Sequence, residues 1–140
     1  MKILPILAIS GALLTLSFHS VAGIVVIGNA ALPDSTLNKK MVKKIFLGKA
    51  QTTPEGADII PVDQAESAVK DEFYNKATKK TPAKLQQYWM KRVMSGKGTK
   101  LDVKGDDAAV KAWVGSNAGA IGYVDDSVVD GSVKVLFAVP

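Results

Sequence analysis

Apolar and polar residues follow one another in blocks that predict strands interleaved with helices. The β-branched run at residues 24–27 is too short for a helix and is typical of a buried inner strand. Residues 58–62 predict a second strand, bounded by turn-forming residues. Residues 120–124 and 133–139 predict the last two strands, which the polar turn between them would allow to pair with each other.

The segments between these strands have the periodicity of apolar residues that predicts helices. Asn38 is a capping residue, so the first helix is expected over about residues 39–47, ending at Gly48. A second amphipathic helix is predicted by apolar residues at a spacing of four. Its stripe consists of Ala65, Val69, Phe73 and Ala77.

Two further helices are marked by start and stop signals. Thr81 followed by Pro82 is a cap and first-turn signal, and Gly96 ends the helix that it starts. Asp106 caps a fourth helix, which ends before Gly115. The large aromatic residues on these helical stripes are interpreted as core rather than ligand contacts: Phe46, Phe73, Trp89 and Trp113.

Alternating strands and helices predict an α/β fold. We expect a single three-layer domain with a central mixed β-sheet flanked by helices. Residues 23–140 suffice for one compact domain with one core, but not for two lobes joined by a hinge.

The first 22 residues have the pattern of a secretory signal peptide. Lys2 precedes a largely apolar run at residues 3–18, and small residues at 20–22 fit a cleavage site after Ala22. The alternative is an uncleaved anchor, but the run is shorter than the roughly 20 apolar residues that span a bilayer. We therefore expect a signal peptide at 1–22, a domain at 23–140 and a periplasmic location.

Composition argues against enzyme chemistry. The chain has no Cys, and its single histidine, His19, lies in the predicted signal peptide. The exported protein would lack the commonest general base, the usual thiol nucleophile and the main zinc ligands. We expect no catalytic residue, no metal and no cofactor. The adjacent acids at Asp106/Asp107 and Asp125/Asp126 are interpreted as caps and solvated loops.

The formal net charge of +5, or one less without Lys2, suits an anionic partner. Four lysines of the first predicted helix lie away from its apolar face: Lys39, Lys40, Lys43 and Lys44. They form either a docking patch for an acidic partner or a solvated helix face. Nucleic acid is not expected, because the other basic residues form no stripe with exposed aromatic residues.

Several short motifs together resemble a known family. They are the sequence Ile-Phe-Leu-Gly-Lys at 45–49, the helix around Phe73, the pair at 88–89 and the sequence Gly-Ala-Ile-Gly-Tyr-Val at 119–124. In this order they resemble the phosphate-type substrate-binding proteins of ABC transporters, over nearly all of residues 24–136. The resemblance is to one lobe, the second, of a type II periplasmic binding protein.

The resemblance implies capture of an anion between two lobes. The second lobe of the family usually presents a Ser-Gly-Thr-Arg segment at a helix N-terminus, and the matching positions here are Ser67, Ala68, Val69 and Lys70. Ser67 is retained, Lys70 replaces the arginine, and Glu66 adds a negative charge beside them. Ser67, Lys70 and Tyr123 are therefore the candidate anion-binding residues.

Two functions remain open at this point. The chain is either a solute-binding-like domain for phosphate or a similar oxyanion in ABC-type uptake, or an interaction or regulatory module of the cell envelope without a ligand. In the first case a homodimer or an envelope protein would supply the surface that faces the ligand.

Overall fold

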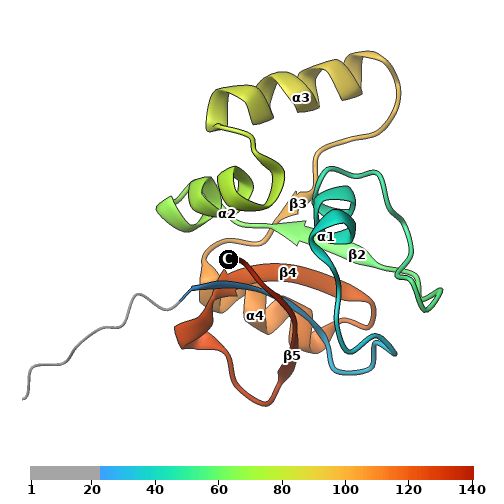
Figure 1. The fold of residues 1–140 in the computed structure, drawn as a ribbon, viewed down its shortest axis with the longest axis vertical. Coiled ribbons are helices and arrows are strands. Elements are labelled where there is room, and N and C mark those ends of the chain that lie inside the picture. Colours follow the sequence, from blue (N-terminus) through green and yellow to red (C-terminus); the bar gives the residue numbers. More distant parts are fainter. Residues whose placement is uncertain (1–22) are drawn as a thin grey trace, which may run out of the picture.

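The computed structural model describes residues 23–140, and the predicted signal peptide with its cleavage site after Ala22 lies outside the described residues. A five-stranded sheet has the order β3-β2-β4-β1-β5 (Figure 1). The strands are β1 (Ile24–Asn29), β2 (Ile60–Asp63), β3 (Asp102–Val103), β4 (Ala120–Asp125) and β5 (Val133–Ala138). The helices are α1 (Lys39–Phe46), α2 (Ala68–Thr78), α3 (Pro82–Met94), α4 (Asp107–Ser116) and the 3-10 turn η1 (Asp126–Val128).

The sheet is mixed, which confirms the predicted fold class. β1 runs antiparallel to both β4 and β5, whereas β2 runs parallel to β4 and to β3. The expected pairing of the last two strands is wrong, because β1 lies between them. All six residues of β1 are buried, and both of its edges form ladders, so it occupies the inner position that its apolar sequence predicted.

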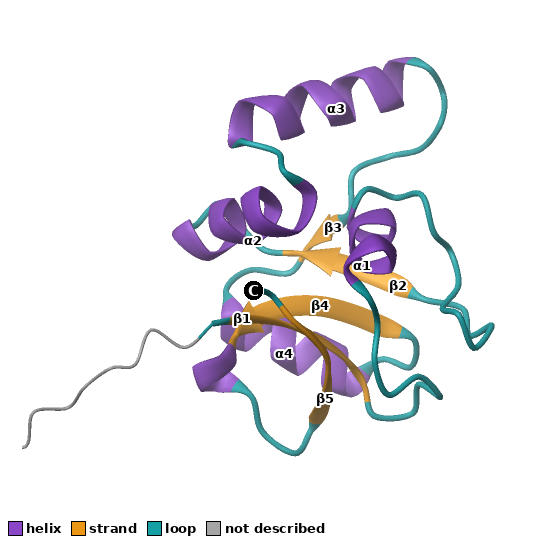
Figure 2. Cartoon of the chain, viewed as in Figure 1, coloured by secondary structure: helices purple, strands orange, loops and turns teal. Residues whose placement is uncertain are grey.

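Helices cover both faces of the sheet, as Figure 2 shows. One apolar cluster joins α1, α2 and α3 to the face that carries Val26 and Tyr123. A second cluster joins α4 to the opposite face, which carries Val25 and Val124. The alternation of neighbouring residues between the two clusters follows from the two-residue period of a strand. The three-layer prediction is therefore confirmed.

The helix caps largely agree with the sequence. The side chain of Asn38 accepts a hydrogen bond from the backbone of α1, and those of Thr81 and Asp106 do the same for α3 and α4. The start of α2 differs: Ala65, the first residue of the predicted stripe, lies outside the helix and is exposed. Ser67 is the N-cap, because its Oγ accepts a hydrogen bond from the backbone N–H of Lys70.

Two strands, β2 and β3, also differ from the prediction. β2 begins at Ile60, two residues later than expected. β3 was not predicted, because a strand of two exposed residues leaves no alternating pattern in the sequence. None of the helices within residues 23–140 has the length and hydrophobicity needed to cross a membrane.

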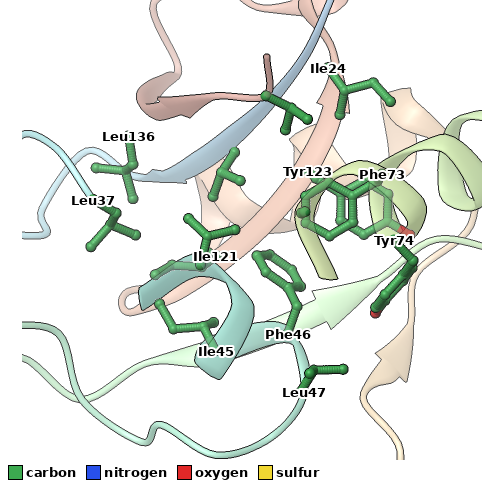
Figure 3. Close-up of a cluster of buried hydrophobic side chains, with 14 of the residues drawn as sticks. Ile24, Leu37, Ile45, Phe46, Leu47, Phe73, Tyr74, Ile121, Tyr123 and Leu136 are labelled. Carbon is green, nitrogen blue, oxygen red and sulfur yellow. The ribbon is translucent and has the colours of Figure 1, made fainter. Parts of the chain in front are cut away.

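Aromatic side chains from α1, α2 and β4 pack together on one face of the sheet. Phe46, Phe73 and Trp89 are buried, as predicted, and Figure 3 shows Phe46 pointing toward the rings of Phe73 and Tyr123. The rings of Phe73 and Tyr123 are stacked, with centroids 3.9 Å apart and an interplanar angle of 6°. Trp113 is only half-buried and packs on the α4 side of the sheet.

Candidate functional site

The carboxyl ends of β2 and β4 bring polar side chains together beside the first turn of α2. The two strands are parallel, so their ends meet at the same edge of the sheet. Asp63 ends β2, Gln64 follows it, and Tyr123 lies near the end of β4. Ligands of open α/β sheets bind at such carboxyl edges, and this is where the candidate residues Ser67 and Lys70 also lie.

Asp63 is the centre of this group. Its carboxylate is buried; Oδ1 accepts hydrogen bonds from the hydroxyl of Tyr123 at 2.5 Å and from the backbone N–H of Gln64 at 2.8 Å. Oδ2 accepts a hydrogen bond from the hydroxyl of Tyr74 at 3.0 Å and lies 3.6 Å from the Nζ of Lys70. The buried negative charge is therefore held by three hydrogen bonds and one cation.

Both tyrosines act as hydrogen-bond donors. Burial is the main reason why the pKa values of Tyr74 and Tyr123 lie well above the ordinary value of 10.0, and the charge of Asp63 adds to it. Their hydroxyl groups consequently remain protonated and directed at the carboxylate of Asp63.

Gln64 ties the same sheet edge to α4. Its buried amide donates to Oδ1 of Asp107 at 2.6 Å and to the backbone oxygen of Tyr123 at 2.8 Å. Oδ1 of Asp107 also accepts a hydrogen bond from the backbone N–H of Asp125 at 3.1 Å. These bonds fix β2, β4 and α4 relative to one another, so the edge is a rigid support for the start of α2.

Lys70 meets two carboxylates. Its Nζ lies 3.0 Å from Oε1 of Glu66 and 3.6 Å from Oδ2 of Asp63. The side chain of Lys70 is only 13% exposed, whereas that of Glu66 is 80% exposed. An anion that approaches the ammonium group from solvent must therefore displace the carboxylate of Glu66, which is the more exposed partner.

The first turn of α2 still offers hydrogen-bond donors. Ser67 caps the N–H of Lys70, while the N–H groups of Ala68 and Val69 have no hydrogen-bond partner within the described residues. As a donor, the hydroxyl of Ser67 has only a long contact of 3.5 Å with Oε1 of Gln64 within the described residues. Free N–H groups at a helix start suit an oxyanion.

Ser67 and Lys70 are thus brought together on one helical turn. Tyr123 is not on that surface: it is fully buried beneath Phe73, and its hydroxyl donates to Asp63. Tyr123 and Lys70 are linked through the carboxylate of Asp63, which both side chains contact.

A cavity of about 520 Å³, the α2–α3 cavity, lies beside Lys70. Tyr74, Leu85 and Trp89 form part of its apolar wall. Its charged wall consists of Asp63, Glu66, Lys70, Asp71 and Lys100. Three carboxylates against two ammonium groups make this cavity mixed in charge, with a slight excess of negative charge. Within residues 23–140, no group of three or more Asp, Glu, His or Cys side chains is placed to hold a metal ion.

Sequence reasoning missed Asp63 and Gln64, the two residues that organise the site. A signal was present, since both are polar and directly follow the buried Val62 at the end of a predicted strand. Polar residues at that point of a strand are placed at the carboxyl edge of the sheet.

The lysines of α1 lie on a separate surface. Lys39, Lys40, Lys43 and Lys44 are all exposed. Lys80, between α2 and α3, lies 4.9 Å from the ring centre of Tyr88, and Lys49 lies 5.9 Å from it. Burial and the nearby charges of Lys43, Lys49 and Lys84 lower the pKa of Lys80. Lys49 and Lys80 therefore lie over the ring of Tyr88, and Lys43 and Lys84 lie near Lys80.

Several solved structures share this fold. A protein from Clostridium perfringens described as a phosphate ABC transporter substrate-binding protein, with bound phosphate, has a TM-score of 0.66 and 23% identity over 82% of this chain and 44% of that chain. PstS from Borrelia burgdorferi has a TM-score of 0.63 and 14% identity over 82% and 46% of the two chains. An ABC-type phosphate transport receptor from Vibrio cholerae has a TM-score of 0.54 and 17% identity over 82% and 45%.

The chain spans less than half the length of these solved proteins. No family model matches the chain, and no curated protein matches its sequence. The likeness to the solved structures establishes the fold: the chain has the architecture of one lobe of a phosphate ABC transporter substrate-binding protein. The resemblance predicted from the sequence motifs is confirmed at that level.

Proposed function

We propose that this chain is a periplasmic solute-binding lobe that binds phosphate or a similar oxyanion at the first turn of α2 and serves ABC-type uptake. The observation that carries the proposal is the set of donors on that turn: the hydroxyl of Ser67, the free N–H groups of Ala68 and Val69, and the ammonium of Lys70. Helix N-termini with free N–H groups attract anions. The phosphate bound in the C. perfringens protein makes phosphate the first anion to test. The periplasmic location rests on the predicted signal peptide.

The proposed site is weak on its own. A helix N-terminus contributes about 0.3 to 1 kcal/mol toward an anion, and a hydrogen bond to a charged group roughly 1.5 to 3 kcal/mol. Part of this energy is lost, because Lys70 must exchange Glu66 for the anion. Since about 4 kcal/mol corresponds to millimolar affinity, we expect millimolar binding. Micromolar capture would need a second surface, from another copy of the chain or from an envelope protein.

The proposal assigns binding rather than catalysis. The solved proteins that share the fold are described as transport receptors and substrate-binding proteins, which supports this assignment. In addition, both carboxylate oxygens of Asp63 accept hydrogen bonds from Tyr74, Tyr123 or Gln64, and the carboxylate is buried. A buried carboxylate whose two oxygens already accept hydrogen bonds is a poor general base.

Isothermal titration calorimetry tests the proposal. Phosphate and sulfate are titrated into the wild-type protein, Ser67→Ala and Lys70→Gln at fixed ionic strength, with the oligomeric state measured in parallel. Thr81→Ala is the matched control, because Thr81 caps α3 as Ser67 caps α2. Saturable phosphate binding that weakens several-fold in the two α2 variants alone supports the site. Absence of saturation at tens of millimolar phosphate, or equal weakening in Thr81→Ala, rejects it.

A second candidate is a ligand-free interaction or regulatory module of the cell envelope. Two observations favour it: Lys70 already has carboxylate partners, and the exposed lysines of α1 adjoin a further group of cations. That group comprises Lys49, Lys80 and Lys84. Binding of an acidic protein surface there would be lost on Lys40→Glu and Lys43→Glu and kept on Lys76→Glu. Binding that ignores these charge reversals rejects this candidate.

A further inference from the structure

Two long segments of the chain contain no acidic residue. Residues 35–54 and residues 73–101 contain no Asp or Glu, so all 13 acidic residues lie elsewhere, while most of the 18 Lys and Arg residues lie within these two segments. Acidic and basic side chains therefore lie largely in different parts of the sequence. A surface lined by one sign of charge concentrates counter-ions of the opposite sign.

The fold brings these two acid-free segments together. The guanidinium of Arg92, in α3, donates a hydrogen bond to the backbone oxygen of Gly48 at 2.7 Å. The hydroxyl of Tyr88 donates to the backbone oxygen of Leu47 at 2.5 Å. These bonds hold the end of α3 against the segment that follows α1.

A second cavity, of about 320 Å³, lies at this junction and is named here the basic cavity. One wall comes from Gly48, Ala50 and Gln51, and the other from Arg92 and the loop at residues 97–101. Its cations are Arg92, Lys97 and Lys100, and Asp102 is its one acidic lining residue. The walls thus carry three positive charges and one negative charge.

The basic cavity differs in charge from the cavity beside Lys70. Lys70 is paired with two carboxylates, whereas no ion pair within residues 23–140 involves Arg92, Lys97 or Lys100. The hydrogen bond to Gly48 uses one donor of Arg92, which leaves further N–H groups of the guanidinium for a ligand. The hydroxyl of Thr99 adds a neutral donor to the lining.

We propose that the basic cavity binds a dianionic phosphate group, either free or as a monoester of a small alcohol. Arg92 supplies a planar fork suited to two phosphate oxygens, and Lys97 and Lys100 supply point charges. The lining also includes the apolar residues Ile59, Pro61 and Leu101, which would contact the organic part of an ester. The basic cavity shares Lys100 and Leu101 with the α2–α3 cavity, but Arg92 and Lys97 line the basic cavity alone. The inference does not depend on the function proposed for the first turn of α2.

The C-terminal end of α3 opposes anion binding in the basic cavity, but hydrogen bonds in the helix cap reduce this effect. The C-terminal end of a helix carries partial negative charge, and the cavity lies near the end of α3. Three of the last four carbonyl groups of α3 are occupied, because the N–H groups of Ser95, Gly96 and Lys97 donate to the oxygens of Lys91, Val93 and Arg92, respectively. These oxygens are consequently directed into the helix cap.

Calorimetric titration with inorganic phosphate and, separately, glycerol 3-phosphate tests the inference. The protein variants are Lys97→Gln/Lys100→Gln and the charge-matched control Lys39→Gln/Lys40→Gln, each made in the wild type and in Ser67→Ala, which removes the hydroxyl of the proposed α2 site, and each checked for folding by circular dichroism. We expect the Lys97/Lys100 pair of substitutions to weaken binding of at least one ligand about tenfold in both backgrounds, with the control pair nearly unchanged. Tighter binding of glycerol 3-phosphate than of phosphate identifies an ester as the ligand, and the reverse identifies the free anion.

Three results would overturn this inference. One is equal weakening in the control pair, which would indicate a general loss of net charge. Another is weakening in Ser67→Ala alone, which would leave the α2 site standing and remove this one. The third is absence of saturable heat with either ligand.

Discussion

Lys70 and Glu66 form an ion pair at the start of α2, with Nζ and Oε1 3.0 Å apart. The carboxylate of Glu66 therefore takes the place that an anion would occupy beside the ammonium. Because Glu66 is mostly exposed, its hold on Lys70 is screened by solvent and small in free energy. The pair lowers the affinity of the first turn of α2 for anions without closing it.

Glu66→Gln should strengthen phosphate binding. Removing an exposed pairing carboxylate recovers up to about 1 kcal/mol, so the expected gain in affinity is about two- to fivefold. Glu72→Gln is the control, because Glu72 pairs with Lys76 on the same helix, 2.7 Å away. Calorimetry with phosphate measures both variants. An affinity that is unchanged in Glu66→Gln, or raised equally in Glu72→Gln, contradicts the geometry proposed for the site.

Tyr123→Phe should destabilise the protein. The substitution leaves the buried carboxylate of Asp63 with one hydrogen bond fewer, which costs about 1 to 3 kcal/mol. Tyr88→Phe removes a hydroxyl that bonds to a backbone oxygen at a half-buried position, so its cost should be smaller. Urea unfolding measures the loss in the free energy of unfolding for each variant. Equal losses in Tyr123→Phe and Tyr88→Phe would argue against a special role of Asp63.

Stability should fall above about pH 10. Burial, followed by the charge of Asp63, raises the pKa of Tyr123 in the folded protein above its unfolded value of about 10. Above that pH the unfolded state loses a proton that the native state keeps, so the unfolded state gains relative stability as pH rises. Each such tyrosine contributes a slope of about 1.4 kcal/mol per pH unit. Urea unfolding between about pH 9 and about pH 11 should show a shallower fall in Tyr123→Phe than in the wild type. Parallel curves would contradict the shift.

Gly119→Ala should be strongly destabilising. Gly119 has a φ of +80°, and an added Cβ would lie 2.8 Å from the backbone oxygen of Asp58. The left-handed backbone alone costs a residue with a side chain about 1 to 2 kcal/mol, and a clash with backbone adds to it. Gly131→Ala is the control, because nothing lies within 4 Å of its added Cβ. A thermal melting temperature of Gly119→Ala within a degree or two of that of the control would contradict the account.

The sequence predicted the elements with strong local signals. Asn38, Thr81 and Asp106 cap the helices that they were expected to start, and the apolar run of β1 is an inner strand. The strand order could not be predicted from the sequence, because the pairing of β1 with β4 and β5 depends on contacts between residues that are distant in the sequence. β3 was also missed, since two residues held by parallel pairing carry no periodic signal.

The candidate site was predicted in part. Ser67 and Lys70 do lie on one helical turn, which their spacing in the sequence implies. The burial of Tyr123 against Phe73, and the role of Asp63 as its acceptor, require the packing of α2 on the sheet. Local sequence patterns do not encode such contacts between elements, so the neutralisation of Lys70 by Asp63 was not foreseen.

The central claim is that the first turn of α2 receives an oxyanion. A ¹H–¹⁵N NMR titration of the protein with phosphate at fixed ionic strength tests it most directly, because each backbone N–H is observed separately. The account predicts that the signals of Ala68 and Val69 shift together, saturate in the millimolar range and lose this response in Ser67→Ala. Signals of Ala68 and Val69 that stay in place up to tens of millimolar phosphate would contradict the claim.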